Sequence, residues 1–227
     1  MIEITPKIVA IDTSTTTLSV ALSLPSGRIL KKNYPDLKKH AELLLPAIQE
    51  LLKDADLSLD KLDAIAVVVG PGSFTGLRVG IVAAQALAYS LGIKVVPITS
   101  LEAMAYSAYQ AHKKNSILCG LDARMNEVYL GKYLYSDETQ QLEEISLEVI
   151  KPELVEIDDD VDVCVGNGFS VYKNIFKGLS VANVDAEIMP LAENVLSIVL
   201  NKISQEKIEF IDPIELHAMY VRNKVVN

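Results

Sequence analysis

A run of fifteen residues without a charged side chain, Val79–Ile93, constrains the fold more than any other stretch of this sequence. It follows an uncharged, β-branched run at Ala64–Val69 and a Gly-Pro-Gly turn at residues 70–72. These segments predict a strand buried on both faces, a tight turn, and a helix that must be covered on every side. Because a membrane-spanning helix requires roughly 20 residues, we expect this helix to pack within protein.

Small residues recur one helical turn apart along this predicted helix. They form a flat ridge that another helix can approach closely. We expect the sheet to cover one face of the helix and a second polypeptide to cover the other. The ridge consists of Gly76, Gly80, Ala84 and Ala88.

Composition limits the classes of function. The chain has 227 residues, of which 50% are hydrophobic and 22% charged, enough for one large or two small cores. A formal net charge of −9 argues against nucleic-acid binding by this chain alone, because phosphate contacts require clustered Lys and Arg. Cys119 and Cys164 lie in apolar runs, which predicts free buried thiols in a reducing compartment. With no signal-peptide pattern at the N-terminus, we expect a cytoplasmic protein.

Strands and helices alternate through the first half of the chain. Period-two and continuous apolar runs predict strands, and one broad apolar stripe after residue 40 predicts a helix. Residues 140–160 are acidic and poorly periodic, and no element is assigned to them. Besides the central strand and helix, the expected strands are Lys7–Asp12, Thr16–Leu24, Arg28–Tyr34 and Lys94–Ile98, and the expected helices are residues 40–55 and 100–110.

The second half of the sequence repeats the first. Two early strands recur at a constant offset of 110 residues, and the later pattern of strand, Gly-x-Gly and helix also recurs. The repeat predicts an α/β protein with the duplicated, two-lobed plan of actin, Hsp70 and sugar kinases (the ASKHA group, RNase H-like), with mixed sheets flanked by helices. We expect the first lobe at 1–100, completed by the C-terminal segment, and a divergent second lobe at 101–227. The matching segments are Ile8–Asp12 with Leu118–Asp122, Thr17–Ala21 with Glu127–Gly131, and Val67–Gly72 with Val163–Gly168.

A phosphate cleft is one function compatible with this plan. In the fold group, a strand-ending Asp faces Gly-rich turns, where backbone amides at a helix N-terminus attract anions. The turn here is not a Walker A loop, because Thr75 stands where the second Gly belongs and no Lys-Ser/Thr follows. The favoured alternative is structural, with a capped helix, Arg78 paired to a local carboxylate, and Asp12 (like Asp122) capping its own turn. A vestigial nucleotide or phosphate site would use Asp12, Gly70, Gly72, Ser73, Thr75, Gly76 and Arg78.

Five motifs together resemble the TsaB (YeaZ) family. They occur in the family's order over nearly the whole chain, and the central one, GPGSFTGLR, is the most specific. The motifs are AIDTS at Ala10–Ser14, KHAELLLP at Lys39–Pro46, GPGSFTGLR at Gly70–Arg78, DARMNEVY at Asp122–Tyr129 and MYVRNKV at Met219–Val225.

The resemblance implies a non-catalytic subunit of the bacterial machinery that forms N6-threonylcarbamoyladenosine at position 37 of tRNAs reading codons that begin with A. It implies a larger catalytic paralogue, TsaD, as heterodimer partner and an ATPase, TsaE, in the larger complex. The resemblance also allows the isolated chain to form a homodimer. It implies that tRNA binds only through the complex and that no membrane is involved. Pairing is expected through the first-lobe helices 40–54 and 77–91, with His40, Leu44, Leu51, Gly76, Gly80, Ala84 and Ala88 at the interface.

No catalytic residue, metal or cofactor is predicted. The paralogue is expected to hold its metal with paired histidines on the helix after the fifth strand, whereas residues 98–112 contain only His112. The sequence has no His-Glu-x-x-His motif, and its other histidines, His40 and His217, are isolated. No nucleophile–base pairing is readable from the sequence. The competing hypothesis is an ASKHA-type ATPase or small-molecule phosphotransferase that uses Asp12 and the Gly70–Gly76 turn.

Overall fold

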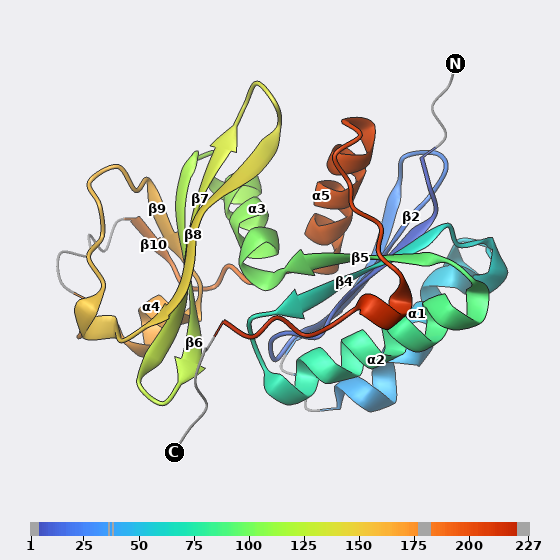
Figure 1. The fold of residues 1–227 in the computed structure, drawn as a ribbon, viewed down its shortest axis with the longest axis horizontal. Coiled ribbons are helices and arrows are strands. Elements are labelled where there is room, and N and C mark those ends of the chain that lie inside the picture. Colours follow the sequence, from blue (N-terminus) through green and yellow to red (C-terminus); the bar gives the residue numbers. More distant parts are fainter. Residues whose placement is uncertain (1–4, 36, 38, 177–182, 222–227) are drawn as a thin grey trace. The chain divides into compact units, whose positions relative to one another are not determined.

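The computed structural model describes residues 5–35, 37, 39–176 and 183–221. The chain divides into two compact units, one formed by Met1–Thr99 with Leu191–Ala218, the other by Ser100–Pro190 with Met219–Asn227. Each unit contains a five-stranded mixed sheet flanked by helices (Figure 1). The predicted α/β class with duplicated mixed sheets is confirmed.

The first unit is built on a sheet with strand order β3-β2-β1-β4-β5. Its first three strands are antiparallel, whereas β4 and β5 run parallel to β1. Every residue of β1, β2 and β4 is buried, which explains why these strands carry uncharged runs rather than an alternating pattern. The strands are β1 (Ile8–Asp12), β2 (Leu18–Ser23), β3 (Ile29–Tyr34), β4 (Ala64–Gly70) and β5 (Lys94–Thr99).

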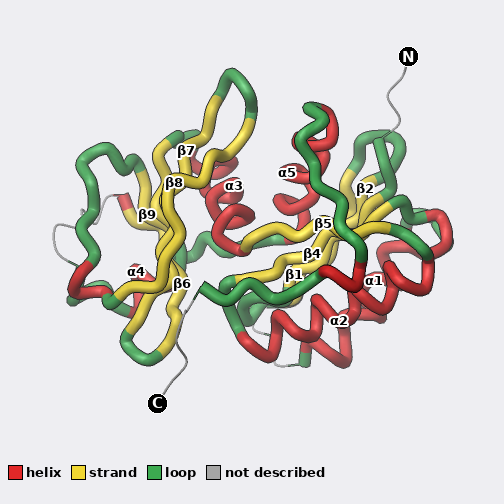
Figure 2. Tube along the Cα trace, in the orientation of Figure 1, coloured by secondary structure: helices red, strands yellow, loops and turns green. Residues whose placement is uncertain are grey.

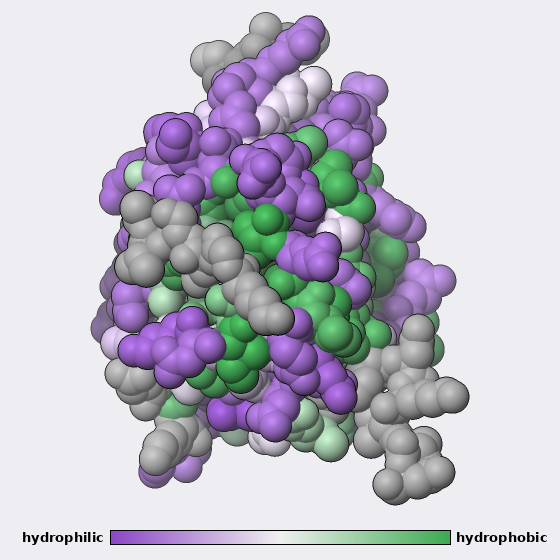
Figure 3. Space-filling view, turned by 90° about the vertical axis from the view of Figure 1, so that its left-hand side faces the viewer, coloured by the Kyte–Doolittle hydropathy of each residue, from purple (hydrophilic) through white to green (hydrophobic). Residues whose placement is uncertain are grey.

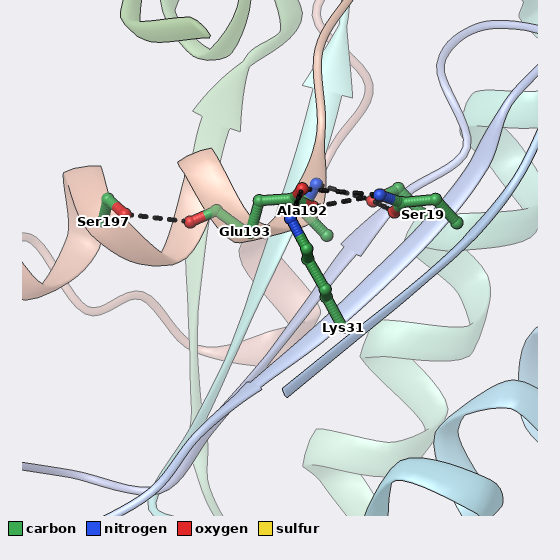
Figure 4. Close-up of polar contacts among 6 residues, drawn as sticks. Ser19, Lys31, Ala192, Glu193 and Ser197 are labelled. Atoms are coloured by element: carbon green, nitrogen blue, oxygen red, sulfur yellow. Dashed lines mark hydrogen bonds and ion pairs between the residues drawn. The ribbon is translucent and has the colours of Figure 1, made fainter. Parts of the chain in front are cut away.

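Three helices flank this sheet. The helices α1 (His40–Asp54) and α2 (Phe74–Leu91) pack side by side on one face, and α5 (Ala192–Ser204) lies on the other (Figures 1 and 2). A polar cluster fixes the start of α5 to the sheet, where the Ala192 amide donates to Ser19 Oγ over 2.8 Å (Figure 4). Lys31 pairs with Glu193 at 2.8 Å in the same cluster. Residues 191–218 therefore belong to the first unit.

The central helix α2 is longer than the uncharged run that predicted it. Its N-cap is Ser73, and it ends at Gly92, whose φ of 67° suits a left-handed C-cap. With 18 residues and a mean hydropathy of 1.3, α2 is long and apolar enough to cross a membrane by length and composition alone. Our prediction that this helix is too short to span a membrane is therefore wrong. Core helices of soluble proteins meet the same criterion, and α2 packs against β4 and β5.

Part of the cover on α2 comes from the chain's own C-terminal segment. Ile211 forms an antiparallel bridge with Val95 at the free edge of β5. Gln85, in the middle of α2, donates through Nε2 to the carbonyl oxygens of Pro213 and Leu216, at 3.2 and 3.0 Å. One flank of the uncharged helix is thus covered without a second polypeptide.

The second unit has the same strand arrangement in a reduced form. Its sheet order is β10-β9-β6-β7-β8, again with three antiparallel strands followed by parallel ones. Figure 3, viewed from the left-hand side of Figure 1, shows apolar side chains among polar ones on this face. The elements are α3 (Ser100–His112), β6 (Ser116–Arg124), β7 (Glu127–Ser136), β8 (Gln141–Ile150), β9 (Val163–Val165), α4 (Asn167–Val171) and β10 (Val184–Asp185).

Strand β8 occupies the region to which no element was assigned. It is an edge strand in which no residue is fully buried. A bulge opposite Lys132 and Tyr133 interrupts its pairing with β7. Without a buried face, the strand has no alternation of polar and apolar residues that sequence reasoning could detect.

Candidate functional site

The Gly-rich turn between β4 and α2 packs directly on the turn that follows β1. The Ser73 amide donates to the carbonyl oxygen of Ser14 over 2.7 Å, and Thr13 Oγ1 donates to that of Gly76 over 2.8 Å. A Cβ atom on Gly72 or Gly76 would collide with the backbone carbonyl of Ser14 or Thr13. Glycine is required at these two positions because two segments of backbone meet there.

The residues predicted for a phosphate site are brought together only in part. Asp12 and the Gly70–Gly76 turn are neighbours, but the amide of Ser73 is bonded to Ser14 and the amide of Gly76 donates to Ser73 Oγ over 3.3 Å. Thr75 and Arg78 are exposed, and the Arg78 guanidinium stacks 3.4 Å from the centre of the Phe74 ring. Two amides of the turn are therefore used for packing and helix capping, and the phosphate hypothesis stays a prediction.

Asp12 is the one fully buried carboxyl among the described residues. Its side chain is fully buried, and Oδ1 accepts a hydrogen bond from the Ser14 amide over 2.8 Å. No described residue forms a hydrogen bond with Oδ2, and the buried Ser14 hydroxyl nearby lies outside hydrogen-bond geometry. Burial raises the pKa of Asp12 to about 7, an effect that the Ser14 side chain and amide partly offset.

Asp122 occupies the equivalent position in the second unit but is fully partnered. Its Oδ1 accepts hydrogen bonds from the Tyr172 hydroxyl and the Arg124 amide, each at 2.9 Å. Its Oδ2 pairs with the Arg124 guanidinium at 3.1 Å, and its own amide donates to Asn167 Oδ1 over 3.0 Å. This carboxylate caps its own hairpin turn, as the structural alternative for Asp122 proposed.

The predicted partner interface requires a correction. The ridge residues face the inside of their own unit, where a Cβ atom on Gly80 would collide with Thr13 Oγ1 and no surface of Ala84 or Ala88 is exposed. Small residues let α2 lie close to β1 and β4, so the ridge packs against the sheet of its own unit and not against a partner. Leu44 and Leu51 of α1 are buried in the same way, while His40 is half-buried and its Nε2 has no hydrogen-bond partner among the described residues. The interface residues predicted wrongly as partner-facing are Leu44, Leu51, Gly76, Gly80, Ala84 and Ala88.

A different row of side chains on the same helices is exposed. Phe74, Val82 and Tyr89 are 58%, 59% and 78% exposed, and their spacing of about two turns places them along one side of α2. On the neighbouring α1, Leu45 is 48% exposed. We call these four residues the outer row. Sequence reasoning missed it because a helix that is apolar all round does not indicate which side faces outward.

The described residues include few side chains suited to metal binding or redox chemistry. Among them, no group of three His, Cys, Asp or Glu side chains lies close enough together to hold a metal ion. Cys119 and Cys164 are free and buried, as predicted, and burial raises the pKa of both thiols. His112 Nε2 lies 2.9 Å from Asp185 Oδ2.

Comparisons with known proteins now place the chain in a family. A family model described as "TsaD: tRNA N6-adenosine threonylcarbamoyltransferase" matches residues 35–204. The tRNA threonylcarbamoyladenosine biosynthesis protein TsaB of Haemophilus influenzae is 33% identical, with 96% of this chain and 94% of the relative covered. TsaB of Escherichia coli is 32% identical, with 96% of each covered.

A solved structure agrees with these relatives. YeaZ from Pseudomonas aeruginosa matches with a TM-score of 0.85 and 32% identity over 95% of this chain and 99% of that one. The resemblance that five motifs indicated is therefore confirmed. The chain belongs to the TsaB (YeaZ) family.

Proposed function

We propose that this chain is a non-catalytic subunit of the machinery that forms N6-threonylcarbamoyladenosine in tRNA. Support comes from the names of its TsaB relatives and from the match to a threonylcarbamoyltransferase family model. On α3, where the resemblance implies that the catalytic paralogue has a metal-binding histidine pair, His112 is the one histidine and contacts Asp185. The activity would then reside in a partner, and this chain would act in the cytoplasm.

The observation that carries the proposal is the outer row on α1 and α2. Four large apolar side chains lie exposed on two adjacent helices, and α2 has no charge from Val79 onward. Exposed apolar surface of this kind typifies protein–protein interfaces, whose energetic centres are aromatic residues such as Tyr89 and Phe74. The first-unit helices remain the proposed docking face, now through their outward side.

The proposed partner is the TsaD-type subunit of the same organism. A partner helix packed on the outer row would exclude water from it, and the chain alone could pair with a second copy through the same row. TsaE and tRNA would join through the larger complex rather than through this acidic chain, whose net charge of −9 opposes direct tRNA binding.

The competing ATPase or phosphotransferase hypothesis has less support. A phosphate cradle requires free amides at the helix N-terminus, but Ser14 and the N-cap already bind those of Ser73 and Gly76. Asp12, the one carboxyl at that point, is enclosed within the unit.

Binding of the purified TsaD-type subunit to matched variants tests the proposal. Val82→Glu places a charge in the outer row, and we expect affinity to fall at least about 100-fold because the charge must be desolvated on docking. Leu154→Glu, at a position 63% exposed in the second unit, is the matched control and should bind as wild type. Unchanged binding by a folded Val82→Glu protein would place the interface elsewhere. Turnover by this chain alone in a tRNA modification assay would refute the non-catalytic role.

A further inference from the structure

The buried carboxyl of Asp12 lies at the joint between β1 and α2, and the proposed function does not use it. Two hydrogen bonds connect this carboxyl to the start of the helix. Oδ1 accepts from the Ser14 amide, and the Ser14 carbonyl oxygen accepts from the Ser73 amide, which precedes α2. A third bond, from Thr13 Oγ1 to the Gly76 carbonyl, closes the joint.

The environment of Asp12 suits a neutral carboxyl and opposes a charged one. The side chain has no exposed surface, and Oδ2 has no hydrogen bond to any described residue. A carboxylate in such a place has lost its water without gaining a counter-charge, so its charged form is destabilised. Burial raises the pKa of Asp12 to about 7, so this carboxyl changes between its neutral and its charged form near neutral pH.

The elements packed against β1 offer no charge that would compensate Asp12. Strands β2 and β4 have no titratable side chain. Helix α2 carries Arg78 and Tyr89, both exposed, and α5 carries Glu193 and Lys202. Glu193 is already bonded to Lys31 and Asn33, and no charged group contributes to the shift at Asp12.

We infer that Asp12 is a proton-controlled latch: the β1 turn stays closed on the N-terminus of α2 while the carboxyl is neutral, and ionisation opens the joint. The least costly relief for a buried carboxylate is the entry of water. Gly72 and Gly76 pack against the carbonyls of Ser14 and Thr13, so separation of these two segments would admit water to the carboxyl. Separation breaks the bond from Ser73 to Ser14 and loosens the first turn of α2.

Through the latch, the order of the first turn of α2, the helix that carries most of the outer row, depends on pH. Phe74, the first residue of α2, belongs to that row and sits next to Ser73. A loosened first turn would leave Phe74 without a fixed position. The latch itself is independent of the proposed function, because it concerns contacts within this chain alone.

Hydrogen exchange of the full-length chain tests the latch. In peptides spanning residues 70–80, the protection factor, corrected for the intrinsic pH dependence of exchange, should fall by up to about tenfold for each pH unit as the pH rises toward 7, and it should level off above about 7, as expected for release of one proton. Asp12→Asn, which keeps the shape and removes the titration, should give protection that does not change from pH 6 to pH 8. Asp54→Asn, which removes an exposed carboxylate of α1 in the same unit, should behave as wild type.

Two results would overturn the inference. One is wild-type protection at residues 70–80 that is constant from pH 6 to pH 8, and the other is a fall that persists in Asp12→Asn. Infrared spectroscopy of the wild-type protein gives a second measurement that does not depend on a folded variant. A protonated carboxyl band should be present at pH 6 and lost by pH 8, and its absence at pH 6 would equally refute the latch.

Discussion

The two units share a strand order, yet they treat the carboxyl near the end of their first strand in opposite ways. In the first unit, Asp12 is sealed from water and its Oδ2 has no partner among the described residues. In the second, Asp122 binds Tyr172, Arg124 and the amide of its own turn. The same residue at the same point of a repeat thus caps its own turn in both units, but only in the first is the carboxyl sealed from water with one oxygen unpartnered among the described residues.

The helices that follow these carboxyls differ as well. In the first unit, α2 has 18 residues and packs against the sheet through a ridge of glycine and alanine. Its counterpart α4 has five residues and begins after Gly166, whose φ is 103°. Both turns pack tightly, because a Cβ atom on Gly166 would collide with the carbonyl oxygen of Gly120 just as one on Gly72 would collide with that of Ser14. The two units therefore differ in the length of the helix and in the burial of the carboxyl, not in the closeness of the turn.

The largest expected effect is loss of folding of the first unit when α2 can no longer pack on its sheet. Ala84→Arg forces a charged side chain into a site with no exposed surface, at a cost of several kcal/mol, because Ala84 faces its own sheet. We expect an insoluble or unfolded protein by circular dichroism.

Ala86→Arg is the matched control on the exposed side of the same helix. It should leave a folded chain that binds the TsaD-type subunit weakly. If Ala84→Arg also folds with a wild-type melting temperature, the ridge does not hold α2 to its sheet, and the contrast with α4 fails.

The second largest effect concerns Asp12 and pH. Its pKa is raised from 3.8 to about 7 in the folded state, so between these values the folded protein holds a proton that the unfolded chain has released. The free energy of unfolding should therefore decrease as pH rises through this window, by up to about 4 kcal/mol, with no further loss above pH 7. Urea titrations at pH 4.5, 6 and 8 (chosen to span about that window) measure it. Asp12→Asn should abolish this decrease, and an unchanged slope in the variant would assign it to other groups.

Sequence alone could predict most of the fold but not the orientation of its central helix. The buried strand Ala64–Val69 and the glycine turn are local signals, and the repeat of a strand-ending Asp with Gly-x-Gly reveals the duplication. A helix apolar on every side has no polar face to mark the exterior. Small residues at 76, 80, 84 and 88 fit a sheet as well as a partner helix, and only the structure shows that Gly76 and Gly80 pack against the β1 end, at Thr13 and Ile11.

The candidate site was predictable in location and not in chemistry. The plan of the fold group places Asp12 and the Gly70–Gly76 turn in one candidate site. In the structure they lie together because they follow parallel strands that end at the same edge of the sheet. Which amides stay free depends on contacts between segments about 60 residues apart, such as Ser14 with Ser73. Local patterns carry no information on such contacts, nor on the burial that perturbs Asp12.

A smaller effect sharpens the contrast between the two carboxyls. Asp122→Asn loses the ion pair with Arg124 and weakens the bonds to Tyr172, so we expect it to destabilise the protein by about 1 kcal/mol. At pH 8, Asp12→Asn should have the opposite sign and stabilise it. Urea midpoints of the two variants at one pH give the comparison directly. If both substitutions destabilise the protein, the two carboxyls contribute to stability in the same sense, and the proposed difference between the units is wrong.

The smallest expected effect is that of ATP. If the Gly-rich turn of the first unit held a phosphate with a dissociation constant of about 10 μM, 1 mM ligand would raise the melting temperature by about 5 to 10 °C. We expect a change below about 1 °C with ATP and magnesium, because the amides of Ser73 and Gly76 are already bonded within the chain. Thermal denaturation with and without nucleotide measures it, and Arg78→Ala, at an exposed position, shows whether any shift belongs to this turn. A clear shift that Arg78→Ala removes would mean that the first unit's turn opens for a ligand, and the enzyme hypothesis would gain its first direct support.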